Sequence, residues 1–153
     1  MIGLNKKMAQ IFSAAVFFVV IDRLLKAYAL RLGDGTELSI VGDWFTFSPV
    51  LNKHIAFSLP LAGPILVTSI IVILFMVLIT AIKQYQSGQI ANAGLLGAIF
   101  LGASSNLYDR FKYSGVIDYF NLKYFSVFNL ADSLIVVSVF LLIFLAIKKP
   151  TRV

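Results

Sequence analysis

Apolar residues fall into four long runs separated by polar segments, at residues 8–30, 64–82, 89–108 and 129–147. A helix rises about 1.5 Å per residue, so about 20 residues cross the roughly 30 Å hydrocarbon core of a bilayer. Each run has about this length, and the second and third contain no charged residue. The pattern predicts an all-α integral membrane protein with four transmembrane helices, forming a single membrane domain over residues 1–153.

Two longer connections, residues 31–63 and 109–128, join these helices at one side of the membrane. In the first, residues 37–41 and 44–48 have the composition of two short strands, and Gly42-Asp43 is a plausible hairpin turn. Residues 55–58 could extend this sheet. We expect a small extracytoplasmic β-cradle, although a plain interfacial loop anchored by Trp44 and its neighbouring aromatic residues fits the same segment.

Composition restricts the chemistry that the chain can perform. Hydrophobic residues make up 59% of the sequence, there is no cysteine, and His54 is the only histidine. These counts exclude disulfides, thiolate ligands, cysteine nucleophiles and zinc sites built on two or more histidines. We expect no metal and no cofactor.

The net charge of +6 would suggest a nucleic-acid partner in a soluble protein, but here the basic residues flank the apolar runs. Lys6, Lys7 and Lys83 lie in two short flanking segments, and Lys148, Lys149 and Arg152 follow the last run; none of these segments contains an acid. By the positive-inside rule, both termini are cytoplasmic and the two longer loops are external. Membrane lipid, and no nucleic acid, is therefore the expected partner, and we expect a monomer.

The start of the chain also resembles a cleavable secretory signal, with Lys6-Lys7, an apolar run and then Ala27-Tyr28-Ala29. However, Asp22, Arg23 and Lys26 crowd the approach to that cleavage site. We therefore expect a retained helix.

Acidic residues lie inside or beside the apolar runs, where a carboxylate costs roughly 2.5–3.5 kcal/mol at a helix centre. All of these acids, together with several amides and cations, occur at the outer ends of the predicted helices or in the outer loops. The set comprises Asp22, Lys26, Asn52, Asn106, Asp109, Arg110, Asp118, Asn129 and Asp132. Their positions predict one polar layer near the outer face of the membrane.

Several of these residues also have purely structural interpretations. Asp22 and Lys26 are four residues apart on one helix face and can form an ion pair. Asp109 and Arg110 could likewise pair at a helix end. Asn129 could cap the last helix, with Asp132 in its first turn favoured by the helix dipole. Asp118 is harder to explain, because it lies in an apolar run with no basic residue within four positions.

Two carboxylates in a low-dielectric cleft do not both ionise easily, so one keeps a proton and the pair can activate water. Asp118 and Asp132 are the acids that we expect to pair. A small transporter or proton-relay subunit, and a non-catalytic scaffold, are the competing interpretations. A relay would place acids at several depths in the bilayer, whereas these acids gather at one end.

The third run is rich in small residues, among them Gly94, Gly97 and Gly102. Small side chains let membrane helices approach closely where no hydrophobic effect drives their association. We expect this helix to pack tightly against its neighbours.

Four motifs resemble those of the lipoprotein signal peptidases (signal peptidase II), the bacterial membrane aspartyl peptidases, over essentially the full chain. They are Asp22-Arg-Leu-Leu-Lys26, Asn52-Lys-His-Ile-Ala-Phe-Ser58, the segment from Asn106 to Phe120, and Phe128-Asn-Leu-Ala-Asp-Ser133. The chain departs from the family pattern at Ser105 and His54, where glycine is usual. Neither departure falls on the two aspartates themselves.

The resemblance implies that Asp118 and Asp132 are the catalytic aspartates. It implies that Asp22, Lys26, Asn52, Asn106, Arg110 and Asn129 support them or bind substrate. It also implies four membrane helices with an outer β-cradle, and a place in the bacterial cytoplasmic membrane. The implied substrate is a prolipoprotein with a diacylglyceryl-modified Cys, cut on the N-terminal side of that Cys.

Overall fold

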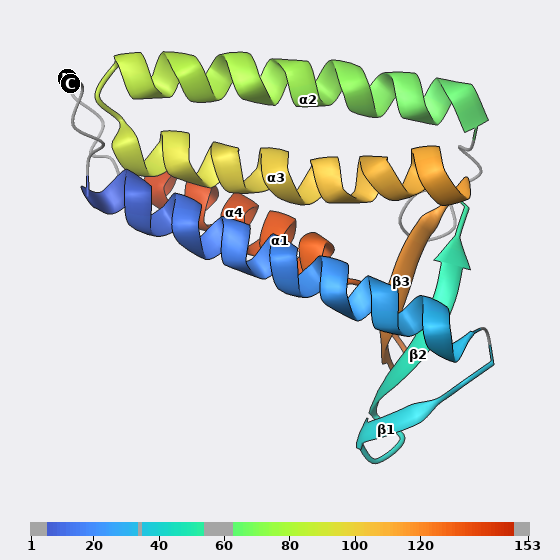
Figure 1. The fold of residues 1–153 in the computed structure, drawn as a ribbon. Coiled ribbons are helices and arrows are strands. Elements are labelled where there is room, and N and C mark those ends of the chain that lie inside the picture. Colours follow the sequence, from blue (N-terminus) through green and yellow to red (C-terminus); the bar gives the residue numbers. More distant parts are fainter. Residues whose placement is uncertain (1–5, 34, 54–62, 149–153) are drawn as a thin grey trace.

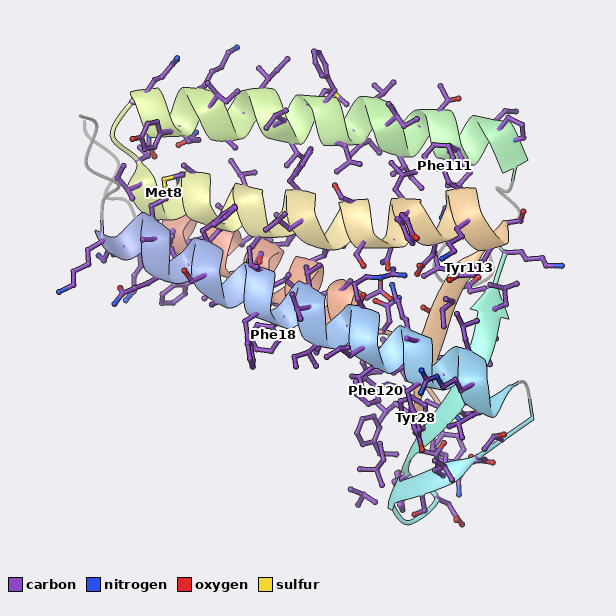
Figure 2. The ribbon with its side chains drawn as sticks, in the orientation of Figure 1. Met8, Phe18, Tyr28, Phe111, Tyr113 and Phe120 are labelled. Atoms are coloured by element: carbon purple, nitrogen blue, oxygen red, sulfur yellow. The ribbon has the colours of Figure 1, made fainter. Side chains whose placement is uncertain are left out.

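The computed structural model describes residues 6–33, 35–53 and 63–148 of the chain. Within these ranges there are four long helices, α1 (Lys6–Leu32), α2 (Gly63–Gln86), α3 (Ile90–Tyr113) and α4 (Leu130–Ile147). All four are long and apolar enough to cross a membrane. Phe18 of α1 projects away from the bundle, as do many other apolar side chains, which suits contact with lipid (Figure 2). The prediction of four transmembrane helices is confirmed.

Helix α3 occupies the centre of the bundle and contacts α1, α2 and α4 (Figure 1). Two of its glycines explain how closely its neighbours approach. A Cβ atom at Gly94 would lie 3.1 Å from Ile11 of α1, and one at Gly102 would lie 3.0 Å from the Ala131 carbonyl oxygen of α4. Nothing lies within 4 Å of a Cβ at Gly97. The tight packing predicted for this helix is therefore confirmed at Gly94, against α1, and at Gly102, against α4.

A small antiparallel sheet lies at the end of the bundle where α1 and α3 finish and α4 begins (Figure 1). Its strands are β1 (Leu38–Val41), β2 (Phe45–Asn52), β3 (Val116–Leu122) and β4 (Val127–Phe128), in the order β1-β2-β3-β4. The predicted hairpin is present as β1 and β2. The proposed extension at residues 55–58 lies outside the described residues, as does His54.

The connection predicted at residues 109–128 is more ordered than the sequence pattern indicated. Helix α3 continues to Tyr113, five residues beyond its expected end, and β3 follows almost at once. Ser114 makes the turn between them with a left-handed φ of 58°. Gly115 is needed for a different reason, because a Cβ there would lie 3.0 Å from the Asn52 carbonyl oxygen of β2. The close pairing of β2 with β3 therefore requires glycine at this position.

The sheet is joined to the bundle by a buried apolar cluster that contains Ala29 of α1, Phe47 of β2, and Ile117 and Tyr119 of β3. The rings of Phe47 and Tyr119 stack, with centroids 5.2 Å apart. Tyr28 and Phe120 lie close by, where α1 meets the sheet (Figure 2). This packing fixes the direction in which β3 presents its side chains to the ends of the helices.

Candidate active site

The structure places the eight sequence-predicted site residues on five elements that meet where the bundle joins the sheet. Five of them line one cavity of about 360 Å³, namely Asn52 of β2, Asn106 and Arg110 of α3, Asp118 of β3 and Asp132 of α4. The other three, Asp22, Lys26 and Asn129, are fully buried. Lys26 donates a hydrogen bond to Asn106 and Asn129 donates one to Asp118, and both acceptors line the cavity. Asp22 contacts Lys26.

The carboxyl group of Asp118 accepts hydrogen bonds from two side-chain amides. Asn129 Nδ2 donates to Oδ1 at 2.7 Å, and Asn52 Nδ2 donates to Oδ2 at 3.0 Å. Burial and the nearby charge of Asp132 together raise the pKa of Asp118 to about 7, although the two amides act in the opposite direction. This carboxyl group therefore keeps its proton at pH values well above those at which an ordinary aspartic acid ionises.

Asp132 lies in the first turn of α4 and completes its N-terminal cap. Asn129 Oδ1 accepts from the Asp132 backbone N–H at 2.9 Å, and Asp132 Oδ2 accepts from the Asn129 N–H at 3.1 Å. The capping interpretation is thus confirmed, but it accounts for only one carboxylate oxygen. The other, Oδ1, accepts from Asn106 Nδ2 at 2.7 Å.

The orientation of the Asn106 amide is fixed by two donors on its oxygen. Lys26 Nζ donates to Asn106 Oδ1 at 2.7 Å and Asn129 Nδ2 donates to it at 3.2 Å. The amide nitrogen consequently points to Asp132. Asn129, through its Nδ2, also joins Asn106 to Asp118, so a continuous set of hydrogen bonds connects the two aspartates.

Lys26, Asp22 and Asp109 are fully buried between α1 and α3, and the partly exposed Arg23 adjoins them. Lys26 Nζ lies 3.1 Å from Asp22 Oδ2, which confirms the predicted pair, and 2.8 Å from Asp109 Oδ2. Arg23 Nη1 lies 2.6 Å from Asp109 Oδ1. Asp109 therefore forms its close ion pairs with two cations of α1, and not only with the adjacent Arg110 as one interpretation of the sequence suggested.

Arg110 instead lies on the cavity wall, where its positive charge interacts with those of Asp118, Asp132 and Asp109. The rest of the wall is largely apolar. It includes Ile70 of α2, Ala103 and Leu107 of α3, and Ile135 and Val136 of α4. Among the described residues, no three His, Cys, Asp or Glu side chains are grouped so that they could hold a metal ion.

Two hydroxyl groups near the aspartates were not predicted as site residues. Ser105 Oγ donates to Asp22 Oδ2 at 2.8 Å, and the Tyr119 hydroxyl donates to Asp22 Oδ1 at 3.0 Å. Ser105 is visible in the sequence only as a departure from the glycine of the related pattern. The position of Tyr119 beside Asp118 gave no such signal, because neighbouring strand residues face opposite sides of a sheet.

The fold and the site together define a polytopic membrane protein with two carboxyl groups in one cavity at the end of its helices. Residues 14–148 match the model of the family described as signal peptidase (SPase) II. The chain therefore belongs to the signal peptidase II family, and it is a protease and a multi-pass protein of a bacterial membrane.

Curated relatives agree with this assignment. The chain is 33% identical to the lipoprotein signal peptidase of Clostridium novyi over 134 residues, which cover 83% of this chain and 90% of the relative. It is 35% identical to the lipoprotein signal peptidase of Chromobacterium violaceum over 155 residues, which cover 92% and 93% of the two chains. The family assignment favours the peptidase interpretation over the transporter and scaffold alternatives.

Two solved structures have the same fold. One is a bacterial membrane enzyme determined by the in meso method at 2.3 Å resolution, with a TM-score of 0.79 and 22% identity, covering 95% of this chain and 94% of that chain. The other, determined in the same way at 1.9 Å resolution, has a TM-score of 0.75 and 24% identity, covering 94% and 95%. The helical bundle with its small sheet is thus an established membrane-enzyme fold.

Proposed function

We propose that Asp118 and Asp132 are the catalytic dyad of a membrane aspartic endopeptidase that removes signal peptides from prolipoproteins. The bond cut is the one on the N-terminal side of a diacylglyceryl-modified Cys. One observation carries the assignment of the dyad: both carboxyl groups line one cavity and are held there by buried amide donors.

In this proposal the two carboxyl groups have different protonation states. Asp118 keeps a proton, consistent with its pKa of about 7. Asp132 is the ionised member, since a carboxylate at a helix N-terminus is favoured by the helix dipole and by the donors of its cap. A dyad that shares one proton in this way can act as acid and base at once.

Hydrolysis then proceeds in two steps. Asp132 takes a proton from a water molecule, whose oxygen attacks the scissile carbonyl carbon while Asp118 gives its proton to the carbonyl oxygen. In the second step the carbon–nitrogen bond breaks, the leaving nitrogen takes the proton from Asp132, and Asp118 recovers a proton from a hydroxyl of the intermediate. Both aspartates return to their starting states.

The other cavity residues position the reactants. Asn52 and Asn129 hold Asp118, and Asn106 holds Asp132. Lys26 holds Asn106 in turn, and Asp22 binds a backbone N–H at the start of α4. Arg110, on the cavity wall, binds the substrate backbone. The apolar wall supplied by α2 and α4 suits a signal peptide and its lipid, because each buried CH₂ of an acyl chain adds about 0.8 kcal/mol to membrane anchoring.

We further propose that the protein acts as a monomer, since this chain by itself supplies both aspartates and the amides that hold them. The distribution of lysines supports cytoplasmic termini and a cavity near the outer face of the membrane. Such a position holds the dyad at the depth of a lipid-anchored cleavage site.

The test is cleavage of a synthetic prolipoprotein by the purified protein in lipid. Asp118→Asn and Asp132→Asn retain side-chain shape but remove the ionisable group, so each should lower kcat by orders of magnitude. The double variant should be little worse than either single variant, because residues that act as one unit are not additive. Wild-type rates from Asp118→Asn protein would refute the dyad.

The same assay tests the substrate. A precursor with an unmodified Cys should be cut far more slowly than its diacylglyceryl form, because it lacks the lipid that holds the bond at the cavity. Equal rates on the two precursors would show that the enzyme recognises the peptide and not its lipid.

A further inference from the structure

The carboxylate of Asp22 makes more contacts than an ion pair with Lys26 requires. It is fully buried, and Lys26 Nζ and Ser105 Oγ approach its Oδ2 at 3.1 and 2.8 Å. The Tyr119 hydroxyl and the Ala131 backbone N–H donate to its Oδ1 at 3.0 and 3.2 Å. One side chain of α1 thus binds groups from α3, β3 and α4.

Two of these partners are the immediate chain neighbours of the dyad. Tyr119 follows Asp118 on β3, and Ala131 precedes Asp132 on α4. The Tyr119 hydroxyl also accepts a hydrogen bond from the Leu130 backbone N–H at 3.0 Å. The strand that carries one aspartate and the helix that carries the other are therefore joined directly, through one hydroxyl group and one carboxylate oxygen.

Packing alone does not explain this hydroxyl group. The ring of Tyr119 stacks on Phe47, a contact that phenylalanine would make equally well. Tyr119 is 0% exposed, and burying a hydroxyl group is unfavourable unless it is hydrogen-bonded. Burial and the charge of Asp22 also raise its pKa, so the hydroxyl group remains a donor.

We propose that Tyr119, acting with Asp22, is a positioning residue of the peptidase reaction. Its hydroxyl group ties β3 to the first turn of α4 and so sets the spacing and relative orientation of the Asp118 and Asp132 carboxyl groups. Ser105 assists by holding the second oxygen of Asp22. This inference rests on the proposed function of the dyad.

Tyr119 can affect the position of the two aspartates without contacting the substrate, because it does not line the cavity that Asp118 and Asp132 share. Loss of its hydroxyl group should change the relative arrangement of the Asp118 and Asp132 carboxyl groups. The other residues that line the cavity should stay in place. A misplacement of about 1 Å can cost roughly 100-fold in rate. We therefore expect kcat of Tyr119→Phe to fall by about 10- to 100-fold, with KM for the diacylglyceryl substrate changed by less than about twofold.

The matched control is Tyr28→Phe. Tyr28 also packs on the ring of Phe47, with centroids 5.6 Å apart, but it is 47% exposed and lies outside the cavity. This variant should cleave at the wild-type rate. Both variants are assayed as the full chain in lipid. Their rates are normalised to the amount of folded protein, which is measured on a separate sample by size-exclusion chromatography and by cooperative thermal unfolding.

A second readout reports the spacing of the dyad. The charge of Asp132 helps to raise the pKa of Asp118, so a wider separation should lower that pKa and move the high-pH limit of kcat to lower pH. A double-mutant cycle of Tyr119→Phe with Ser105→Ala should be non-additive in kcat, because both hydroxyl groups act through Asp22.

Three results would overturn the inference: a wild-type kcat, a rise in KM at constant kcat, or a loss of rate that vanishes on correction for folded protein. If Tyr119→Phe is not recovered folded, Ser105→Ala is judged by the same criteria. The proposed function is tested separately. If Asp118→Asn and Asp132→Asn are inactive while Tyr119→Phe is fully active, the dyad stands and only its positioning by Tyr119 fails.

Discussion

Asp118 and Asp132 are both held by side-chain amides, but their surroundings differ. Asp132 also accepts a backbone N–H at the start of α4, whereas the donors to Asp118 are the amides of Asn52 and Asn129. An amide donor stabilises a carboxylate without supplying the full charge of a lysine or arginine. This moderate stabilisation suits a proton that must be held and then released during one catalytic cycle.

The first residue-scale prediction concerns pH. Asp118 must hold its proton in the proposed mechanism, so activity should fall as pH rises through about 7. The charged groups that act on it are Asp132 of α4, Lys26 of α1 and Arg110 of α3. Asn52→Ala removes a donor that lowers the Asp118 pKa, so the high-pH limit should move upward. A profile of kcat against pH in lipid, for both proteins, checks the direction.

The second prediction concerns Asp109, which is fully buried between Arg23 and Lys26. Asp109→Asn would remove the carboxylate that pairs with Arg23 and one of the two that pair with Lys26, and breaking a buried ion pair typically costs about 3–5 kcal/mol. The main effect should be a lower unfolding temperature in detergent. If Asp109→Asn abolishes kcat with unchanged thermal stability, Asp109 has a more direct part in the reaction.

At the scale of elements, the boundaries depend on contacts that the sequence does not reveal. The apolar run predicts an end to α3 at Tyr108, because Asp109, Arg110 and Lys112 follow it. The helix nevertheless continues to Tyr113. Asp109 is buried against Arg23, a residue 86 positions away, and no local pattern can indicate that pairing. By contrast, the uninterrupted apolar runs of α2 and α4 were sufficient to predict those helices.

Strand β3 was missed for a related reason. Residues 116–119 are all buried, so the strand lacks the alternation of apolar and polar residues that marks a half-exposed strand. Asp118 stood out in the sequence because it is an unpartnered acid in an apolar run. Its contact with Asn52 depends on the pairing of β2 with β3, which composition could not predict.

Gly115 provides a prediction for that pairing. Alanine there would place a Cβ atom 3.0 Å from the Asn52 carbonyl oxygen and 3.1 Å from the Leu51 side chain. We expect β2 to move away from β3, which weakens the Asn52–Asp118 hydrogen bond and costs about 1–3 kcal/mol of stability. Unfolding temperature and kcat should both fall.

The control for Gly115→Ala is Gly97→Ala on α3, where nothing lies within 4 Å of the added Cβ atom. Alanine favours a helix over glycine by roughly 0.5–1 kcal/mol, so this variant should be as stable as the wild type or more so. Equal losses in the two variants would mean that the space beside Asn52 is not the cause.

At the scale of the whole molecule, β3 and the start of α4, which carry Asp118 and Asp132, lie at the end of the bundle where α1 and α3 end (Figure 1). The orientation of the bundle therefore decides which compartment meets the cavity. Reporter fusions after Lys149 should be cytoplasmic, and fusions near Asp43 or Lys123 should be external, as the flanking lysines predict. An external C-terminus would put the cavity on the cytoplasmic side and contradict the proposed substrate.

The elements that line the cavity differ in how they are attached to the bundle. Strand β3 and helix α4 are tied to α1 through buried polar groups, whereas α2, which contributes Ile70, packs mainly on α3. A shift of α2 would disturb that one apolar interface and none of the hydrogen bonds around Asp118 and Asp132. The width of the cavity beside α2 is therefore set separately from the geometry of the two carboxyl groups. On the proposed function, α2 would limit the bulk of the signal peptide that enters, and β3 and α4 would determine where the bond is cut.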